Sequence, residues 1–388
     1  MPGKRLVVFG ILWALLPCFT LPSLGAEAPS VSAVSAVLMD GESGRVLFAQ
    51  NAEEPRPIAS ITKLMTGLLA AEMLPNLDET VTIRKEWTGI EGTSLYLKPG
   101  ENLTLRTLLY GLLLQSGNDA AVALAGICAG DTLSFVERMN QRAAEIGMTN
   151  THFADPNGLS DENHCSTALD MARLAAVCLQ NPTVAEIVAT RSVSMEGRSL
   201  VNHNKLLWQY PGCIGMKTGY TRQAGRTLVS AAQREGQTLI CVTLCDSDDW
   251  TDHAALFDYG FASFPRTVLA EAGTVLHRVP VEGSLLHFAP VSVRATVGCA
   301  LGEGETVEES VALPTYAIAP ITEGKAAGTV TYRVGDTVVG TADLVWSTSV
   351  RRDVLAERPM RSALDFLRRL GEKKPILETF AALRQTSM

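Results

Sequence analysis

Apolar residues along the chain first follow the period of β-strands and then that of helices. Strand-like stretches at 31–38 and 45–49 flank a polar, Gly-containing turn at 40–44, which predicts a hairpin. Apolar residues then recur at spacings of three and four along 61–69 and along 105–113. This spacing predicts two helices, each with one buried face.

Strand-like runs return at 227–232 and 238–244, so one long segment begins and ends in strands with helices between them. This order predicts an α/β (α+β) domain over residues 29–270, with one sheet built from both ends of the segment. From 275 to 350, short β-branched runs alternate with Gly. We expect a small all-β domain there, a β-sandwich.

Residues 1–28 have the features of an export signal: two basic residues, an apolar run over 6–19 and small residues around 26–28. A retained membrane-spanning helix is the alternative. It is less favoured because Pro17 and Pro22 interrupt the run, which is also shorter than the ~20 residues that span a bilayer.

The C-terminal segment 351–388 is basic and reads as helical, with nine Lys or Arg against five Asp or Glu. One apolar stripe is formed by Met360, Ala363, Leu364, Leu367 and Leu370. A basic amphipathic helix can lie in a membrane interface, so we expect this segment to be a membrane anchor. The alternative is a helix that packs on its own domain.

Composition narrows the class of protein. The net charge of −8 is opposite to the basic surface that nucleic-acid binding requires, so no nucleic-acid partner is expected. With 46% hydrophobic and 19% charged residues, the chain is globular and not disordered. Eight cysteines, one of them in the predicted signal, leave an odd number, and we predict no disulfide framework.

Three short motifs carry the candidate chemistry. Each alone is weak, since an S-x-x-K string is expected about once by chance in a chain of this length. Their contexts support a functional role. The first motif opens an amphipathic helix, and the third precedes a strand. The second lies between two helices, where Asn118 can cap the later one. In chain order they are Ser60-Ile61-Thr62-Lys63, Ser116-Gly117-Asn118 and Lys217-Thr218-Gly219.

A serine and a lysine three residues apart on a helix lie on one face, so the Lys63 amine can reach the Ser60 hydroxyl. Lys63 must be neutral to act as a base. Desolvation and a second cation, for which Lys217 is the candidate, would lower its pKa. The backbone N–H groups of Ser60 and Tyr220 are the candidates for an oxyanion hole.

The remaining motif residues suit a peptide substrate. Ser116 can relay a proton to the leaving amine, and Asn118 can offer its amide to a substrate backbone and to Lys63. Lys217 and Thr218 suit a substrate carboxylate. Gly219 lets an extended peptide lie close to an edge strand.

These motifs resemble those of the penicillin-interacting serine enzymes, and the S-G-N form resembles the low-molecular-mass D-alanyl-D-alanine carboxypeptidases of peptidase family S11. The similarity covers about residues 31–265, and 275–350 resembles the C-terminal β domain of that family. Further similar stretches lie at 57–66, 111–120, 155–159, 170–172 and 211–225.

The resemblance implies a penicillin-binding/β-lactamase-like transpeptidase fold, an antiparallel sheet with helices on both faces. It also implies that Ser60 attacks the bond between the last two D-alanines of a peptidoglycan stem and forms an acyl-enzyme, with no metal or cofactor. β-Lactam antibiotics would acylate the same serine. The enzyme would act outside the cytoplasmic membrane, in the cell wall or periplasmic space, where it would control wall maturation.

Two departures from the family pattern concern the substrate carboxylate. Some members carry an Arg inside the stretch that reads Asn202-His203-Asn204 here, and members often carry a basic residue where 246–253 is acidic. Tyr220 stands where some members have His. The balance between carboxypeptidase and endopeptidase activity therefore stays open.

Two other functions compete with this interpretation. A β-lactamase on the same scaffold would need a Glu-x-x-x-Asn stretch between the second and third motifs, but Glu137, Glu145 and Glu162 are not followed by Asn at that spacing. A non-catalytic wall-binding protein would have a broken motif, and all three motifs are intact.

Overall fold

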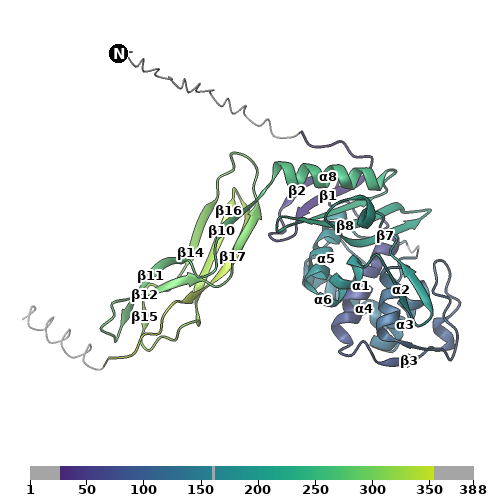
Figure 1. The fold of residues 1–388 in the computed structure, drawn as a ribbon, viewed down its shortest axis with the longest axis horizontal. Coiled ribbons are helices and arrows are strands. Elements are labelled where there is room, and N and C mark those ends of the chain that lie inside the picture. Colours follow the sequence, from purple (N-terminus) through teal and green to yellow (C-terminus); the bar gives the residue numbers. More distant parts are fainter. Residues whose placement is uncertain (1–26, 160–161, 354–388) are drawn as a thin grey trace, which may run out of the picture.

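The computed structural model describes residues 27–159 and 162–353, and the chain in these ranges forms two bodies with separate hydrophobic cores (Figure 1). The predicted export signal and the basic C-terminal segment lie almost entirely outside the described residues.

The first body is built on a five-stranded antiparallel sheet with the strand order β2-β1-β9-β8-β7. The predicted hairpin supplies two strands, and the last strands of the body pair beside them, so the sheet joins both ends of the segment. The strands are β1 (Ser35–Asp40), β2 (Val46–Gln50), β7 (Cys213–Thr221), β8 (Gly225–Arg234) and β9 (Gln237–Leu244).

Helices cover both faces of this sheet. Alternate residues of β1 point to opposite sides, so that Val37 and Met39 join the large core on one face while Leu38 joins a smaller core on the other. The antiparallel sheet and the helices on both faces confirm the predicted fold class. The helices are η1 (Ala59–Thr62, 3₁₀), α1 (Lys63–Met73), η2 (Lys85–Trp87, 3₁₀), α2 (Leu105–Leu113), α3 (Asn118–Ala129), α4 (Thr132–Ile146), α5 (Ala168–Gln180), α6 (Pro182–Ala189), α7 (Leu206–Gln209) and α8 (Asp249–Ser263).

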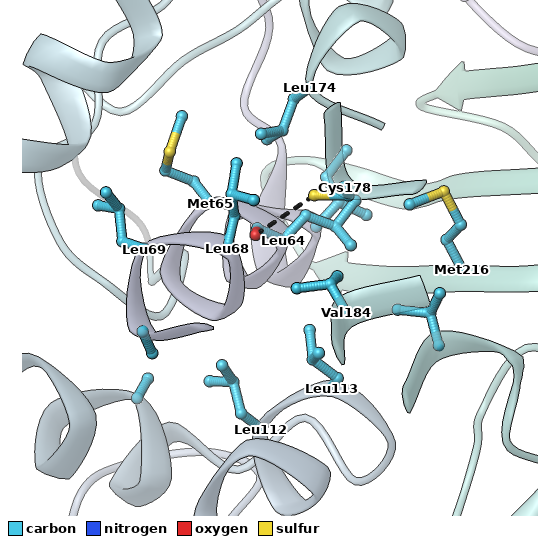
Figure 2. Close-up of a cluster of buried hydrophobic side chains, with 14 of the residues drawn as sticks. Leu64, Met65, Leu68, Leu69, Leu112, Leu113, Leu174, Cys178, Val184 and Met216 are labelled. Carbon is cyan, nitrogen blue, oxygen red and sulfur yellow. Dashed lines mark hydrogen bonds between the residues drawn. The ribbon is translucent and has the colours of Figure 1, made fainter. Parts of the chain in front are cut away.

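Helix α1 runs through the middle of the larger core. Figure 2 shows its apolar residues surrounded by side chains from α2, α5, α6 and β7. Leu64, Met65 and Leu68 are fully buried, and the Cys178 thiol points at the Leu64 carbonyl at 3.7 Å. Because α1 is buried on all sides, the residues at its N-terminus are held in a fixed position. Two small ribbons complete this body: β3 (Thr80–Thr82) with β4 (Asn102–Thr104), and β5 (Ser192–Met195) with β6 (Arg198–Val201).

The second body contains only strands. A six-stranded sheet has the order β14-β16-β17-β12-β11-β15, and β10 pairs with β13 as a separate ribbon. The two pieces share one core that includes Val291, Tyr332 and Trp346. The strands are β10 (Arg266–Ala270), β11 (Val275–Glu282), β12 (Phe288–Val293), β13 (Val297–Ala300), β14 (Glu308–Ala312), β15 (Ala317–Ile318), β16 (Ala326–Val334) and β17 (Thr337–Trp346).

The two bodies are joined by ion pairs around the β1–β2 turn. Arg45 donates to the Glu305 carboxylate (Nη1–Oε2, 2.7 Å) and to the Ala300 carbonyl at 2.9 Å. Glu42 accepts from the Arg266 guanidinium at 2.7 and 3.0 Å and from the Gly298 amide at 2.9 Å. We call these two pairs and their backbone contacts the joint. Its side chains are between 12% and 34% exposed, so the pairs are half-buried at the surface and each adds only modestly to stability.

Within the described ranges, no single helix is both long and apolar enough to cross a membrane, and α3 with α4 passes that test only as a pair bent by 85°. The seven cysteines of the described part are free thiols.

Candidate active site

Ser60 lies in η1, the short 3₁₀ helix that leads directly into α1. Two glycines let other segments approach it closely. A Cβ on Gly219 would lie 2.9 Å from the Ser60 amide nitrogen, and a Cβ on Gly158 would collide with the carbonyl oxygen of Ala59. The residue before the serine, Ala59, has a φ of 50°, an unusual value for a non-glycine residue. The packing around η1 thus holds the serine in a strained, well-defined turn.

Lys63 is the first residue of α1, and its side chain is completely buried. Its amine donates to the Ser60 hydroxyl at 2.9 Å and to the carbonyl of Asn157. Burial and the nearby Lys217 lower the pKa of the Lys63 amine well below its ordinary value. The serine and the lysine predicted from the first motif therefore lie within hydrogen-bond reach, and the lysine is neutral more readily than in water.

The Asn157 carbonyl that holds Lys63 belongs to a turn that is fastened to η1 and α1. Asp155 Oδ1 accepts from the amides of Asn157 (2.8 Å) and Gly158. Thr66 Oγ1 donates to the Pro156 carbonyl at 2.5 Å. His164 bonds Thr62 Oγ1 at 2.7 Å, so a second part of the same loop grips the serine turn. This turn lies outside the three motifs, although its Asp-Pro-Asn-Gly sequence is typical of a turn.

Ser116 and Asn118 come from the connection between α2 and α3. Ser116 is buried in the left-handed region, with a φ of 61°, which turns it towards the cleft rather than into a helix. The predicted cap is wrong: the N-cap of α3 is Gly117, and the Asn118 amide donates to the Glu91 carbonyl at 2.6 Å. The Lys63 amine, the other partner expected for Asn118, donates to Ser60 and Asn157. Asp119 instead binds the loop 94–97, through its carboxylate, at the start of α3.

Lys217, Thr218 and Gly219 precede the strand β8, as the sequence predicted, and they also lie inside a strand of their own, β7. β7 is the edge strand of the sheet, next to η1, so one side of its backbone faces the cleft. The Lys217 amine is buried and donates to the Thr218 carbonyl at 2.8 Å. Burial lowers its pKa to about 7.

A cleft of about 410 Å³ opens between the serine turn, the edge strand and the start of α8. It brings together five of the predicted residues, while Lys63, Asn118 and Lys217 are buried beside it. His203, Asp249 and Trp250 also line it and belong to the two stretches that depart from the family pattern, whereas Thr93 and Arg226 were not foreseen from the sequence. The residues that line it are Ser60, Thr93, Ser116, His203, Thr218, Gly219, Tyr220, Arg226, Asp249 and Trp250.

Arg226 supplies a positive charge at the end of this cleft. It lies on β8, and its guanidinium donates through Nε to Asp249 Oδ2 at 3.1 Å and through Nη2 to the other carboxylate oxygen. The guanidinium carbon is 5.6 Å from the centre of the Trp250 ring. The acidic stretch 246–253 thus holds an arginine from another strand, a contact that no local pattern could reveal.

Comparison with known proteins agrees with this geometry. The model of the Peptidase S11 family, described as D-alanyl-D-alanine carboxypeptidase, matches residues 23–248. The chain belongs to peptidase family S11.

Relatives extend the family match into the β domain. The chain is 31% identical over 312 residues to the D-alanyl-D-alanine carboxypeptidase DacF of Bacillus subtilis, covering 76% of this chain and 80% of the relative. It is 33% identical to DacC of Escherichia coli, covering 79% and 82%. The crystal structure of penicillin binding protein 5 from Haemophilus influenzae superposes with a TM-score of 0.73 at 29% identity, covering 84% of this chain and all of that one.

Family S11 membership confirms the resemblance drawn from the three motifs. The chain is accordingly a serine peptidase of the carboxypeptidase class. The two places where it departs from the family pattern both lie at one cleft: His203 lines it and accepts or donates a bond to Gln115 at 3.0 Å, and Asp249 anchors Arg226.

Proposed function

We propose that this protein removes the terminal D-Ala from peptidoglycan stem peptides that end in D-Ala-D-Ala. The observation that carries the proposal is the buried Lys63 amine, 2.9 Å from the Ser60 hydroxyl at the floor of an open cleft. This pair can generate a serine nucleophile without a histidine.

In the proposed reaction, Lys63 accepts the Ser60 proton as the oxygen attacks the carbonyl carbon of the penultimate D-Ala. The backbone N–H groups of Ser60 and Tyr220 stabilise the oxyanion. The peptide bond breaks, D-Ala leaves with a proton relayed through Ser116, and an acyl-enzyme remains. Water then hydrolyses the ester and restores the serine.

Substrate binding follows the chemistry of the cleft walls. An extended peptide adds alongside β7, whose free edge offers backbone donors and acceptors. The terminal carboxylate is bound by Thr218, by the protonated form of Lys217 and by Arg226. Arg226 lines the cleft on β8, and it compensates for the arginine that the stretch 202–204 lacks.

A β-lactamase is less well supported because it needs a second base to hydrolyse the acyl-enzyme. Among the described residues that line the cleft, Asp249 is the only carboxylate, and it is paired with Arg226. We therefore expect the penicilloyl enzyme to persist.

The same proposal places the enzyme outside the cytoplasmic membrane. It is exported by the signal in residues 1–28, and the basic segment 351–388 attaches it to the membrane surface.

The test measures D-Ala release from a D-Ala-D-Ala peptide and the intact mass after treatment with penicillin, for residues 29–388. Wild type releases D-Ala and keeps a stable penicilloyl adduct, whereas Ser60→Ala does neither. Arg226→Gln keeps the adduct but loses about tenfold or more in kcat/KM for the peptide, because a charge-assisted bond to the carboxylate is removed.

Other outcomes separate the alternatives. Rapid loss of the adduct with release of penicilloate would favour the β-lactamase. Cleavage of cross-linked dimers without D-Ala release would favour the endopeptidase, and an adduct on Ser60→Ala would refute the nucleophile assignment.

A further inference from the structure

Large apolar side chains are exposed together at one end of the β domain. Each is between 50% and 62% exposed, although residues of this size are ordinarily covered when they cluster. We call this cluster the tip patch; it consists of Leu285, Leu286, Phe288, Tyr316 and Ile318.

The strand register brings these residues to one face. Phe288 on β12 lies opposite Pro280 on β11, and Ile318 on β15 lies beside Glu282, which is also on β11. The side chains between them, Val279 and Val281, point into the core, so the alternating residues of the three strands face solvent. Leu285 and Leu286 occupy the turn between β11 and β12. In Figure 1 this corner, around β11, β12 and β15, lies at the end of the β domain away from the catalytic body.

The described chain also ends at this corner. The Asp353 amide donates to the Gly283 carbonyl at 2.8 Å, and its carboxylate accepts from the Leu285 amide at 3.2 Å. The last described residue is therefore fastened to the β11–β12 turn. The residues that follow belong to the basic segment 351–388, with its stripe of apolar residues.

We propose that the tip patch inserts into the headgroup region of an anionic lipid bilayer, next to the C-terminal segment. This inference rests on the membrane attachment proposed above and names a second, folded contact for it. The basic segment is drawn to anionic lipid, and Asp353 near its start is bonded to the turn, so the segment brings the turn towards the membrane surface. Burial of the five apolar side chains then adds to binding at little further entropic cost.

The observations favour a bilayer over a protein partner. The patch is the end of one hairpin and a neighbouring strand, and a stable protein interface takes about 20–30 residues on each side. Glu282 is exposed beside Ile318, and its carboxylate stays in water. The β11–β12 turn beyond it is therefore the part that inserts deepest into the bilayer.

The experiment uses the full mature chain, residues 29–388, and flotation with vesicles of phosphatidylcholine and phosphatidylglycerol. The variant Leu285→Ser/Leu286→Ser/Phe288→Ser should bind about tenfold or more weakly than wild type, since apolar area is lost from the interface. The matched control is Val275→Ser/Val338→Ser, which changes comparably exposed residues of the same domain outside the tip patch and should bind as wild type does. D-Ala release from a soluble peptide should be the same for all three proteins.

A second measurement does not depend on any variant. Hydrogen exchange of wild type at residues 283–288 should become slower when vesicles are present than it is without them, beyond the protection that the bond from the Leu285 amide to Asp353 already gives. Equal vesicle binding by the triple variant and wild type would overturn the inference while the C-terminal anchor stands. Absence of binding by wild type would refute the membrane attachment itself.

Exchange of 283–288 that is equally slow with and without vesicles would also overturn the inference. It would mean that the C-terminal segment, or a second copy detected by sedimentation, covers the patch.

Discussion

Lys63 and Lys217 are both buried, and burial lowers the pKa of each amine. The two play different parts in the proposed reaction. Lys63 must be neutral to accept the Ser60 proton, and its lowered pKa makes the neutral amine more available than that of an ordinary lysine. Lys217 must be protonated to attract a carboxylate, and its pKa of about 7 means that this charge is lost on the alkaline side.

A pH dependence follows from Lys217. In the free enzyme its charge is present below pH 7 and disappears as the pH rises through about 7, so kcat/KM for the peptide should fall over that range. Arginine stays protonated at all accessible pH values, so Lys217→Arg should lack this decline, whatever its overall activity. Initial rates measured from about pH 5.5 to about pH 9, on both sides of the Lys217 pKa of about 7, test this prediction. An identical alkaline limb in both proteins would contradict the role of Lys217.

The turn 155–158 holds the base Lys63 and packs against the residue before the nucleophile Ser60. Gly158 has a φ of 80°, and a Cβ there would collide with the Ala59 carbonyl, one residue before Ser60. Gly158→Ala should displace the serine turn, and a misplacement of about 1 Å can cost about 100-fold in rate. Acylation by a chromogenic β-lactam gives the measurement.

Gly147 provides the control for this substitution. It has a similar φ of 83° at the end of α4, but a Cβ there meets nothing within 4 Å. Gly147→Ala should therefore cost about 1 kcal/mol of stability from backbone strain alone and leave acylation unchanged. Equal loss of acylation in both variants would mean that strain, and not the collision with η1, is responsible.

Elements with a strong local signal were predictable from the sequence, and contacts between distant segments were not. The periodicity of 61–69 and 105–113 predicted α1 and α2, and the strands at both ends of the catalytic segment predicted the sheet. The pairing of Ser60 with Lys63 follows from helix geometry. Arg226 could not be foreseen, because its partner Asp249 is on another element and an acidic stretch gives no sign of what it binds. The position of Asn118 was misjudged because an Asn before a helix ordinarily caps it, whereas here α3 begins one residue earlier than predicted, at Asn118 itself, and Gly117 is the N-cap.

At the scale of the whole molecule, the joint determines how the catalytic body is carried by the β domain. Arg45–Glu305 and Arg266–Glu42 lie on the two sides of the β1–β2 turn and both cross between the bodies. With two half-buried pairs and bonds to the backbone of Ala300 and Gly298, the connection is expected to be stiffer than a flexible linker.

Removal of the joint should make the molecule flexible without harming the cleft. In Glu42→Gln/Glu305→Gln both ion pairs lose their negative partner, and small-angle scattering should show a broader distribution of shapes. D-Ala release from a soluble peptide should stay unchanged, since neither residue lines the cleft. Glu72→Gln, which breaks the Arg142–Glu72 pair inside the catalytic body, should leave the scattering as in wild type. A double variant that scatters like wild type would show that the apolar contacts near Phe264 suffice to hold the bodies together.

A stiff joint has a consequence for which part of the wall the enzyme can reach. If the tip patch rests in the bilayer, the β domain holds the cleft at a fixed distance from the membrane. The cleft then reaches only a thin layer of the wall parallel to the membrane. Stem peptides inside that layer would be trimmed, and those nearer to or farther from the membrane would keep their terminal D-Ala. The protein would then select stem peptides by their distance from the membrane, and this distance would distinguish newly inserted glycan strands from older ones.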